Sequence, residues 1–139
     1  MFQRILVPVD ITQKSLGAVN MAYDLAAQSG AEVILLHVIE TIEHIQFEEL
    51  KPFYERLENN ARKTLQRFSE RFVSENLKLE QSILYGQRIR KIVEYATDNR
   101  VDLIIMASHR IDPEKPDRDW NSISYTTAIL SPCPVLLVK

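Results

Sequence analysis

The segment from Val101 to Arg110 constrains the fold most strongly, because it is apolar over most of its length and ends in Ser-His-Arg. A short, continuous apolar run is typical of a strand buried on both faces, as in a parallel sheet covered by helices. Ligands of such sheets bind outside the carboxyl ends of the strands. Ser108, His109 and Arg110 therefore stand where a binding site is expected, although a solvated polar loop has the same composition.

Similar patterns predict the other elements of the chain. Strands are expected at residues 4–9, 32–38, 79–85 and 135–138, in addition to the run already described. Apolar residues at helical spacing predict helices between the cap Thr12 and the stop Gly30, and at about residues 47–74, 89–96 and 122–130. In the first helix Leu16 is expected on the buried face, and in the second Phe53. The strand at 79–85 is the most polar, which suits the edge of a sheet.

This alternation of strands and helices predicts an α/β fold with one doubly wound, five-stranded parallel sheet and helices on both faces. The strand order that fits is 3-2-1-4-5, which reverses direction between strands one and four. Asp10 closes strand one, and residues 107–110 close strand four. These residues, almost one hundred positions apart in sequence, should therefore meet in one crevice at the switch point.

Length and composition limit the class of protein. The 139 residues suit a single domain over 1–139 with one sizeable core. Seventeen basic and nineteen acidic residues leave a net charge of −2, so no general positive field attracts nucleic acid. No apolar run is long enough for a membrane span or a signal peptide, and Cys133 is the single cysteine. We therefore expect a cytoplasmic protein with neither a nucleic-acid nor a membrane partner.

Motifs for catalysis or metal binding are missing. With only three glycines, the chain has neither a dinucleotide-binding fingerprint nor a phosphate loop ending in Gly-Lys-Ser/Thr. His37, His44 and His109 lack metal-ligand spacing, and His37 is expected to pack in the core. Ser108 and His109 are adjacent in sequence, so they are poorly placed to act as nucleophile and base. We expect no metal site and no enzymatic activity.

Four segments together resemble the universal stress protein family. They are Ile5-Leu6-Val7-Pro8-Val9-Asp10, Ala31-Glu32-Val33-Ile34-Leu35-Leu36-His37-Val38, Asp102-Leu103-Ile104-Ile105-Met106-Ala107-Ser108-His109-Arg110 and Pro132-Cys133-Pro134-Val135-Leu136-Leu137-Val138. The resemblance spans the whole chain. It implies the same five-stranded fold, a dimer and, in one branch of the family, ATP or AMP at the switch point.

The resemblance also implies roles for individual residues. Asp10 would contact the nucleoside, Pro8 and Val9 would line the pocket, and the backbone of Val38 would touch adenine. The phosphates would lie against two further segments, consisting of Met106, Ala107, Ser108, His109 and Arg110, and of Asn121, Ser122 and Ile123.

The chain departs from the family's glycine-rich phosphate loop. Ala107, Arg110 and Asn121 stand where that pattern has glycine, and only Ser122 matches it. The loop between is one residue longer and carries several carboxylates, which would repel a triphosphate. Backbone N–H groups approach phosphate most closely at glycine, so the binding of ATP should be weakened more than that of AMP. Arg110 could replace the lost backbone donors with a charged side chain.

Two functions stay open on these residues ahead of a third, a slow ATPase, for which Asp10 and His109 are the only candidate residues. The first is a regulator or sensor that binds an adenine nucleotide weakly. The second is a dimeric protein-interaction module that has lost nucleotide binding. In both, an exposed apolar edge strand would pair two copies, through Val135, Leu136, Leu137 and Val138.

Overall fold

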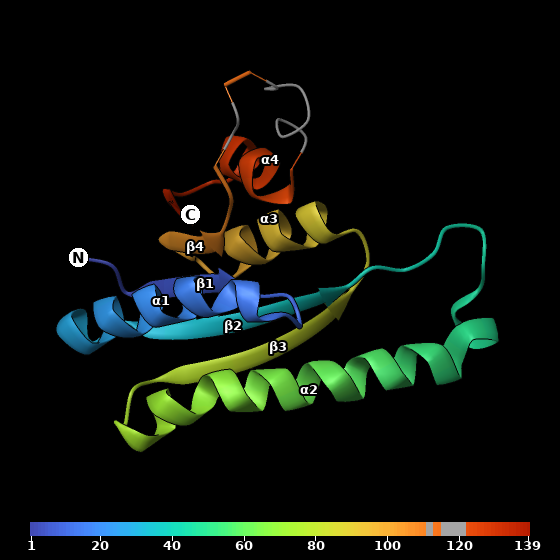
Figure 1. Cartoon of the computed structure of the whole chain (residues 1–139), viewed down its shortest axis with the longest axis horizontal. Helices are drawn as coiled ribbons and strands as arrows, with labels where there is room; N and C mark the ends of the chain where they lie inside the picture. Colours follow the sequence, from blue (N-terminus) through green and yellow to red (C-terminus); the bar gives the residue numbers. More distant parts are fainter. Residues whose placement is uncertain (111–112, 115–121) are drawn as a thin grey trace.

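The computed structural model describes residues 1–110, 113–114 and 122–139 (Figure 1). Its strands are β1 (Arg4–Pro8), β2 (Glu32–Ile39), β3 (Leu79–Tyr85), β4 (Leu103–Ala107) and β5 (Val135–Val138). Its α-helices are α1 (Leu16–Ser29), α2 (Lys51–Ser74), α3 (Arg88–Asp98) and α4 (Ile123–Leu130). Short 3-10 turns, η1 (Gln13–Ser15) and η2 (Phe47–Leu50), precede α1 and α2.

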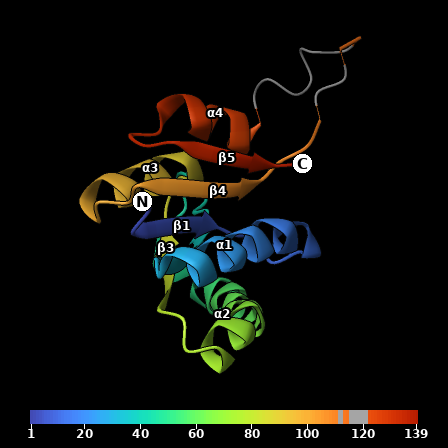
Figure 2. The ribbon, with the colours of Figure 1, turned by 90° about the vertical axis from the view of Figure 1, so that its left-hand side faces the viewer.

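The five strands form one parallel sheet in the order β3-β2-β1-β4-β5, as the sequence predicted. β1 lies between β2 and β4, with Leu6 opposite both Ile34 and Ile104. β3 and β5 are the two edges, and Figure 2 shows β5 beside α4 at one end of the molecule. The switch point therefore lies between the carboxyl ends of β1 and β4.

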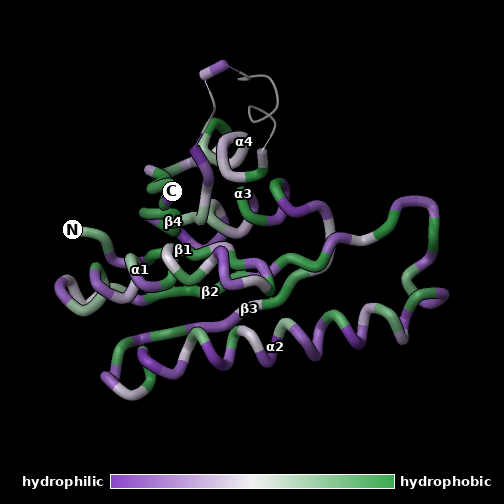
Figure 3. The backbone as a smooth tube through the Cα atoms, in the orientation of Figure 1, coloured by the Kyte–Doolittle hydropathy of each residue, from purple (hydrophilic) through white to green (hydrophobic). Residues whose placement is uncertain are grey.

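Alternate residues of the central strands enter two separate cores. On one face Ile5, Leu35 and Ile105 pack against α1 and α2, which contribute residues such as Ala22 and Phe72. The opposite face carries Leu6, Ile34 and Ile104, which pack with Ile92 and Ala96 of α3. Because both faces of the central strands are buried, these strands are mostly apolar, whereas the edge strand β3 carries polar residues, as the tube in Figure 3 shows. The two layers of helices hold the carboxyl ends of the strands in fixed positions.

The first helical segment begins and ends at the residues that the sequence indicated. The Thr12 side chain accepts a hydrogen bond from the Lys14 N–H, but it caps η1 rather than α1 itself. Gly30 ends α1 in the left-handed region at φ 74°. The expectation that Leu16 is buried is wrong, because it begins α1 on the solvent side and is 40% exposed.

The second helix also differs from the sequence prediction in which residue it buries. Phe53 was expected on the buried face, but it is 37% exposed while the adjacent Tyr54 is buried. The Tyr54 ring stacks on Phe47, and its hydroxyl accepts a hydrogen bond from the Ile42 N–H. The start of α2 thus packs against its own preceding segment.

No helix within the described ranges is long and apolar enough to cross a membrane.

Candidate functional site

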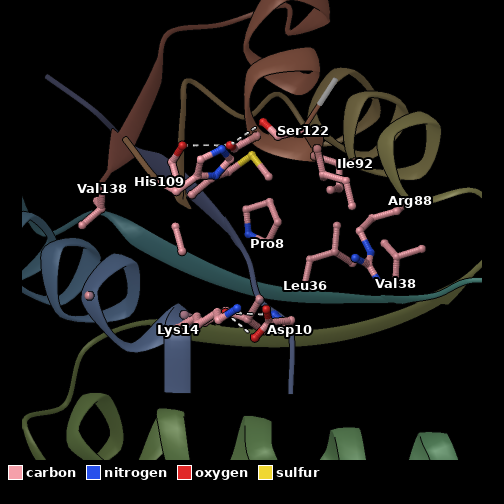
Figure 4. Close-up of a pocket in the computed structure, with 18 of the residues that line it drawn as sticks. Pro8, Asp10, Lys14, Leu36, Val38, Arg88, Ile92, His109, Ser122 and Val138 are labelled. Atoms are coloured by element: carbon pink, nitrogen blue, oxygen red, sulfur yellow. Dashed lines mark hydrogen bonds between the residues drawn. The ribbon is translucent and has the colours of Figure 1, made fainter. Parts of the chain in front are cut away.

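A cavity of about 630 Å³ opens at the switch point of the sheet (Figure 4). Its walls come from the carboxyl ends of β1, β2, β4 and β5, from η1 and from the starts of α1, α3 and α4. Asp10 and Ser108 both line it. The topology therefore brings together the two segments that the sequence placed at this point, and the volume is that of a small-molecule site.

Asp10 is held by the loop that follows β1. Its Oδ1 atom accepts hydrogen bonds from the Thr12 N–H at 2.8 Å, the Thr12 hydroxyl at 2.6 Å and the Ser15 hydroxyl at 3.1 Å. Burial alone would raise the pKa of this carboxyl, but these hydrogen bonds and the nearby charge of Arg88 outweigh burial, and the pKa lies below its usual value. Asp10 is therefore an anion with a fixed orientation. All three bonds go to Oδ1, which leaves Oδ2 for a ligand.

The backbone of Val38 forms a second polar edge of the cavity. The Leu36 carbonyl accepts from the Val9 N–H at 2.8 Å, so Leu36 turns its backbone groups toward β1. Val38, two residues further along β2, turns its N–H and C=O the same way, but β1 ends at Pro8. In the described part of the chain no strand covers this edge, and it can pair with a ligand that carries one donor beside one acceptor.

His37 lies next to the cavity residues in the core and does not line the cavity itself. The residue is 9% exposed, and its Nδ1–H donates to the Val9 carbonyl at 2.8 Å, since a carbonyl can only accept. Burial is the main reason that the pKa of His37 lies below its usual value, so the ring is neutral near pH 7. This agrees with the expectation of a packed core histidine. Its hydrogen bond fixes the backbone immediately before Asp10.

Three serine hydroxyls gather at the start of α4. Ser108 Oγ lies 2.9 Å from Ser124 Oγ, which in turn lies 3.3 Å from Ser122 Oγ. Ser122 also caps α4 by accepting a hydrogen bond from the Tyr125 N–H. All three serines line the cavity. Hydroxyl donors beside a helix N-terminus form a polar corner that suits an anion.

Of the residues predicted from sequence, most lie in this lining. They are Pro8, Val9, Asp10, Val38, Met106, Ala107, Ser108, His109, Ser122 and Ile123. Arg110 is exposed and is not among the lining residues. Asn121 lies outside the described residues, as does most of the charged loop.

The sequence analysis missed several residues of the lining. They are Lys14, Ser15, Gly17, Leu36, Arg88, Ile92, Ser124, Val138 and Lys139. Ser15 and Lys14 follow Asp10 closely, and Val138 and Lys139 close a strand beside β4, so the predicted topology itself contained the signal for these four. The position of Arg88 depends on how α3 starts relative to β2, which no pattern in the sequence indicates.

No group of three or more His, Cys, Asp or Glu side chains is placed to hold a metal ion within the residues described. The cavity instead combines three features. Much of its lining is apolar, the Asp10 carboxylate and the Val38 backbone supply polar groups, and Figure 4 shows Ser122 on the other side of Pro8 from Asp10. Such an arrangement suits a flat, polar-edged ring joined to an anionic group.

The strand order and the helices on both faces define a doubly wound α/β domain, and its cavity lies at the switch point. The whole chain, residues 1–139, matches the profile of the Universal stress protein family, and the protein belongs to that family. It is 26% identical over 149 residues to the universal stress protein YxiE of Bacillus subtilis (strain 168), with both chains covered completely.

Two solved structures share the fold. A universal stress protein in complex with cAMP is 22% identical with a TM-score of 0.78, covering 99% of this chain and 97% of that one. The universal stress protein from Archaeoglobus fulgidus in complex with dAMP is 17% identical with a TM-score of 0.71, covering 99% and 98%.

Proposed function

We propose that this protein binds an adenine nucleotide at the switch-point cavity and acts as a dimeric cytoplasmic stress regulator or sensor rather than as an enzyme. The observation that carries the proposal is the joint placement of the Asp10 carboxylate and the uncovered Val38 backbone edge in one cavity of about 630 Å³. A carboxylate accepts hydrogen bonds from ribose hydroxyls, and an N–H beside a C=O matches an adenine edge.

The nucleoside half of the cavity is complete. Pro8, Val9 and Leu36 provide apolar walls, and Asp10 Oδ2 is left for a sugar hydroxyl because the loop bonds go to Oδ1. The solved relatives with cAMP and dAMP are complexes with adenine nucleotides that carry one phosphate. They support the same class of ligand here.

The phosphate half is reduced relative to a glycine-rich loop. The serine hydroxyls and the start of α4 suit one phosphate, while Ala107 keeps its Cβ where a glycine would let backbone donors approach. Arg110 is exposed outside the lining and remains the candidate cation for outer phosphates. AMP should therefore bind better than ATP.

The edge strand β5 is the proposed dimer contact. Ser108 N–H donates to the Val138 carbonyl and Ile104 N–H to the Pro134 carbonyl, so every second residue of β5 faces β4. Val135 and Leu137 turn their backbone groups to the open edge. Exposed Leu136, Ile129 and Leu130 lie on β5 and α4 and add apolar area there. Pairing of two copies would cover both the open backbone edge of β5 and this apolar area.

A second function is favoured by the missing glycines, namely an interaction module that no longer binds nucleotide. An experiment on the purified protein distinguishes the two functions. Heat denaturation followed by absorbance and mass spectrometry of the supernatant should release an adenine nucleotide. If none is released and none binds on addition at millimolar concentration, the interaction module replaces the nucleotide-binding proposal.

A further inference from the structure

Arg88 enters the nucleoside half of the cavity from the first position of α3. The preceding Gln87 caps α3, because its side chain accepts a hydrogen bond from the Arg90 N–H. The Arg88 side chain crosses to the carboxyl end of β2 and lies beside Leu36 and Val38 (Figure 4). Arg90, on the same helix, does not line the cavity, and its side chain is 76% exposed against 35% for Arg88.

The guanidinium of Arg88 is only weakly engaged by the protein. Its ion pair within the described residues joins Nε to Glu40 Oε1 at 3.8 Å, and the Glu40 side chain is 54% exposed. An exposed pair at that separation contributes little. The charge of Arg88 also acts on Asp10 and on His37, lowering the pKa of each. The guanidinium is thus directed into the site with its two terminal nitrogens left for a ligand.

We propose that Arg88 is a ligand-binding residue that stacks its guanidinium on the base of the bound nucleotide. The inference rests on the proposed nucleotide function and deepens it. A guanidinium is planar and weakly hydrated, and it stacks on aromatic rings. Here it faces the region bounded by Leu36, Val38 and Ile92, where a base would pair with the Val38 backbone.

A contact with the phosphate would require a different placement. The serine hydroxyls that suit an anion stand at β4 and α4, and Figure 4 shows Ser122 and His109 on the other side of Pro8 from Arg88. Arg88 should therefore contribute equally to a nucleoside and to its monophosphate, because the base is common to both.

The test compares adenosine and AMP by isothermal titration with the full chain. The Arg88→Ala variant should bind both ligands more weakly by a similar factor, about fivefold or more. The Arg88→Lys variant, which keeps the charge but loses the plane, should recover only part of the loss. Arg90→Ala is the matched control on the same helix and should bind both ligands as the wild type does. Thermal unfolding of each variant verifies that the fold is retained.

Each contrary result has a separate meaning. If Arg88→Ala weakens AMP but not adenosine, Arg88 acts on the phosphate and the inference is wrong. Unchanged affinity for both ligands, or full recovery in Arg88→Lys, overturns stacking while leaving the nucleotide function intact. If the wild type binds neither ligand at millimolar concentration, the proposed function itself fails and the inference fails with it.

Discussion

Replacing Asp10 by asparagine should weaken AMP binding while leaving the fold almost unchanged. The reason is that the two carboxylate oxygens have different partners. Oδ1 accepts three hydrogen bonds from Thr12 and Ser15, and the asparagine oxygen can accept the same bonds. Oδ2 has none of these bonds, and in Asp10→Asn an NH₂ group takes its place, which cannot accept from a ribose hydroxyl.

The size of the effect follows from these contacts. A hydrogen bond to a charged group contributes about 1.5 to 3 kcal/mol, which corresponds to a loss of roughly 10- to 150-fold in affinity. The unfolding free energy of Asp10→Asn should fall by less than about 1 kcal/mol, because the Oδ1 bonds persist and are partly solvent-exposed. Asp10→Ala removes the acceptor altogether and should lower stability by about 1 to 2 kcal/mol, as loss of a helix-capping side chain does.

Isothermal titration with AMP and urea unfolding of the same samples measure the two effects. Thr12→Ala is the control, because it removes one partner of Oδ1 and the cap of η1 but leaves Oδ2 in place. This control should lose stability and keep most of its affinity. If Asp10→Asn binds AMP as tightly as the wild type, Oδ2 does not contact the ligand and the assignment of Asp10 is refuted.

Three further predictions concern other parts of the chain. Leu137→Pro removes an N–H from the open edge of β5 without removing a bond to β4, so it should weaken the proposed dimer while the fold is retained. Light scattering after size exclusion tests this, and a monomeric wild type at micromolar concentration would contradict it. Arg110→Gly should lower affinity for ATP and leave AMP unchanged in titration, and equal effects on the two nucleotides would count against a role at the outer phosphates. The pKa of His37 is lower in the folded chain than in the unfolded chain, so the unfolded state takes up the proton first as the pH falls. The contribution of His37 to the unfolding free energy should therefore be constant above about pH 7 and decrease as the pH drops through roughly 6.5. His37→Gln should flatten that fall in urea unfolding between about pH 7 and 5, and an unchanged profile in this variant would exclude His37 as the cause.

The fold was predictable because the central strands carry a simple signal. β2 and β4 are buried on both faces, so their sequences are continuously apolar, and the polar β3 could be placed at an edge. Chain connectivity and the handedness of crossovers then leave few strand orders. The positions of Asp10 and Ser108 follow directly from that order.

Local packing was less predictable. Helical spacing could not separate Phe53 from Tyr54, because the start of α2 packs on η2 and the residues after β2 rather than on the sheet alone. Leu16 is exposed for a related reason, since it stands at the first turn of α1, where the helix has just begun. The ends of helices depend on tertiary contacts that periodicity does not encode.

The charged residues of the site were the hardest to find. Lys14 and Arg88 stand at helix starts, where a charged side chain ordinarily faces solvent, and nothing in the sequence distinguishes Arg88 from Arg90. Arg110 seemed better placed in the sequence, directly after β4, yet it is exposed outside the cavity lining. The direction of a long side chain depends on the tertiary contacts around its backbone, which the sequence pattern does not give.

Titration of the wild-type protein with AMP and ATP under identical conditions tests the central claim most directly. An intact nucleoside half with a reduced phosphate half predicts measurable binding of AMP and weaker binding of ATP. If two charge-assisted phosphate contacts are lost, the affinity for ATP should be roughly two to four powers of ten below that of an intact glycine-rich loop. Binding of ATP at submicromolar affinity would show that the phosphate half is not reduced. Failure of both nucleotides to bind at millimolar concentration would contradict the claim as a whole.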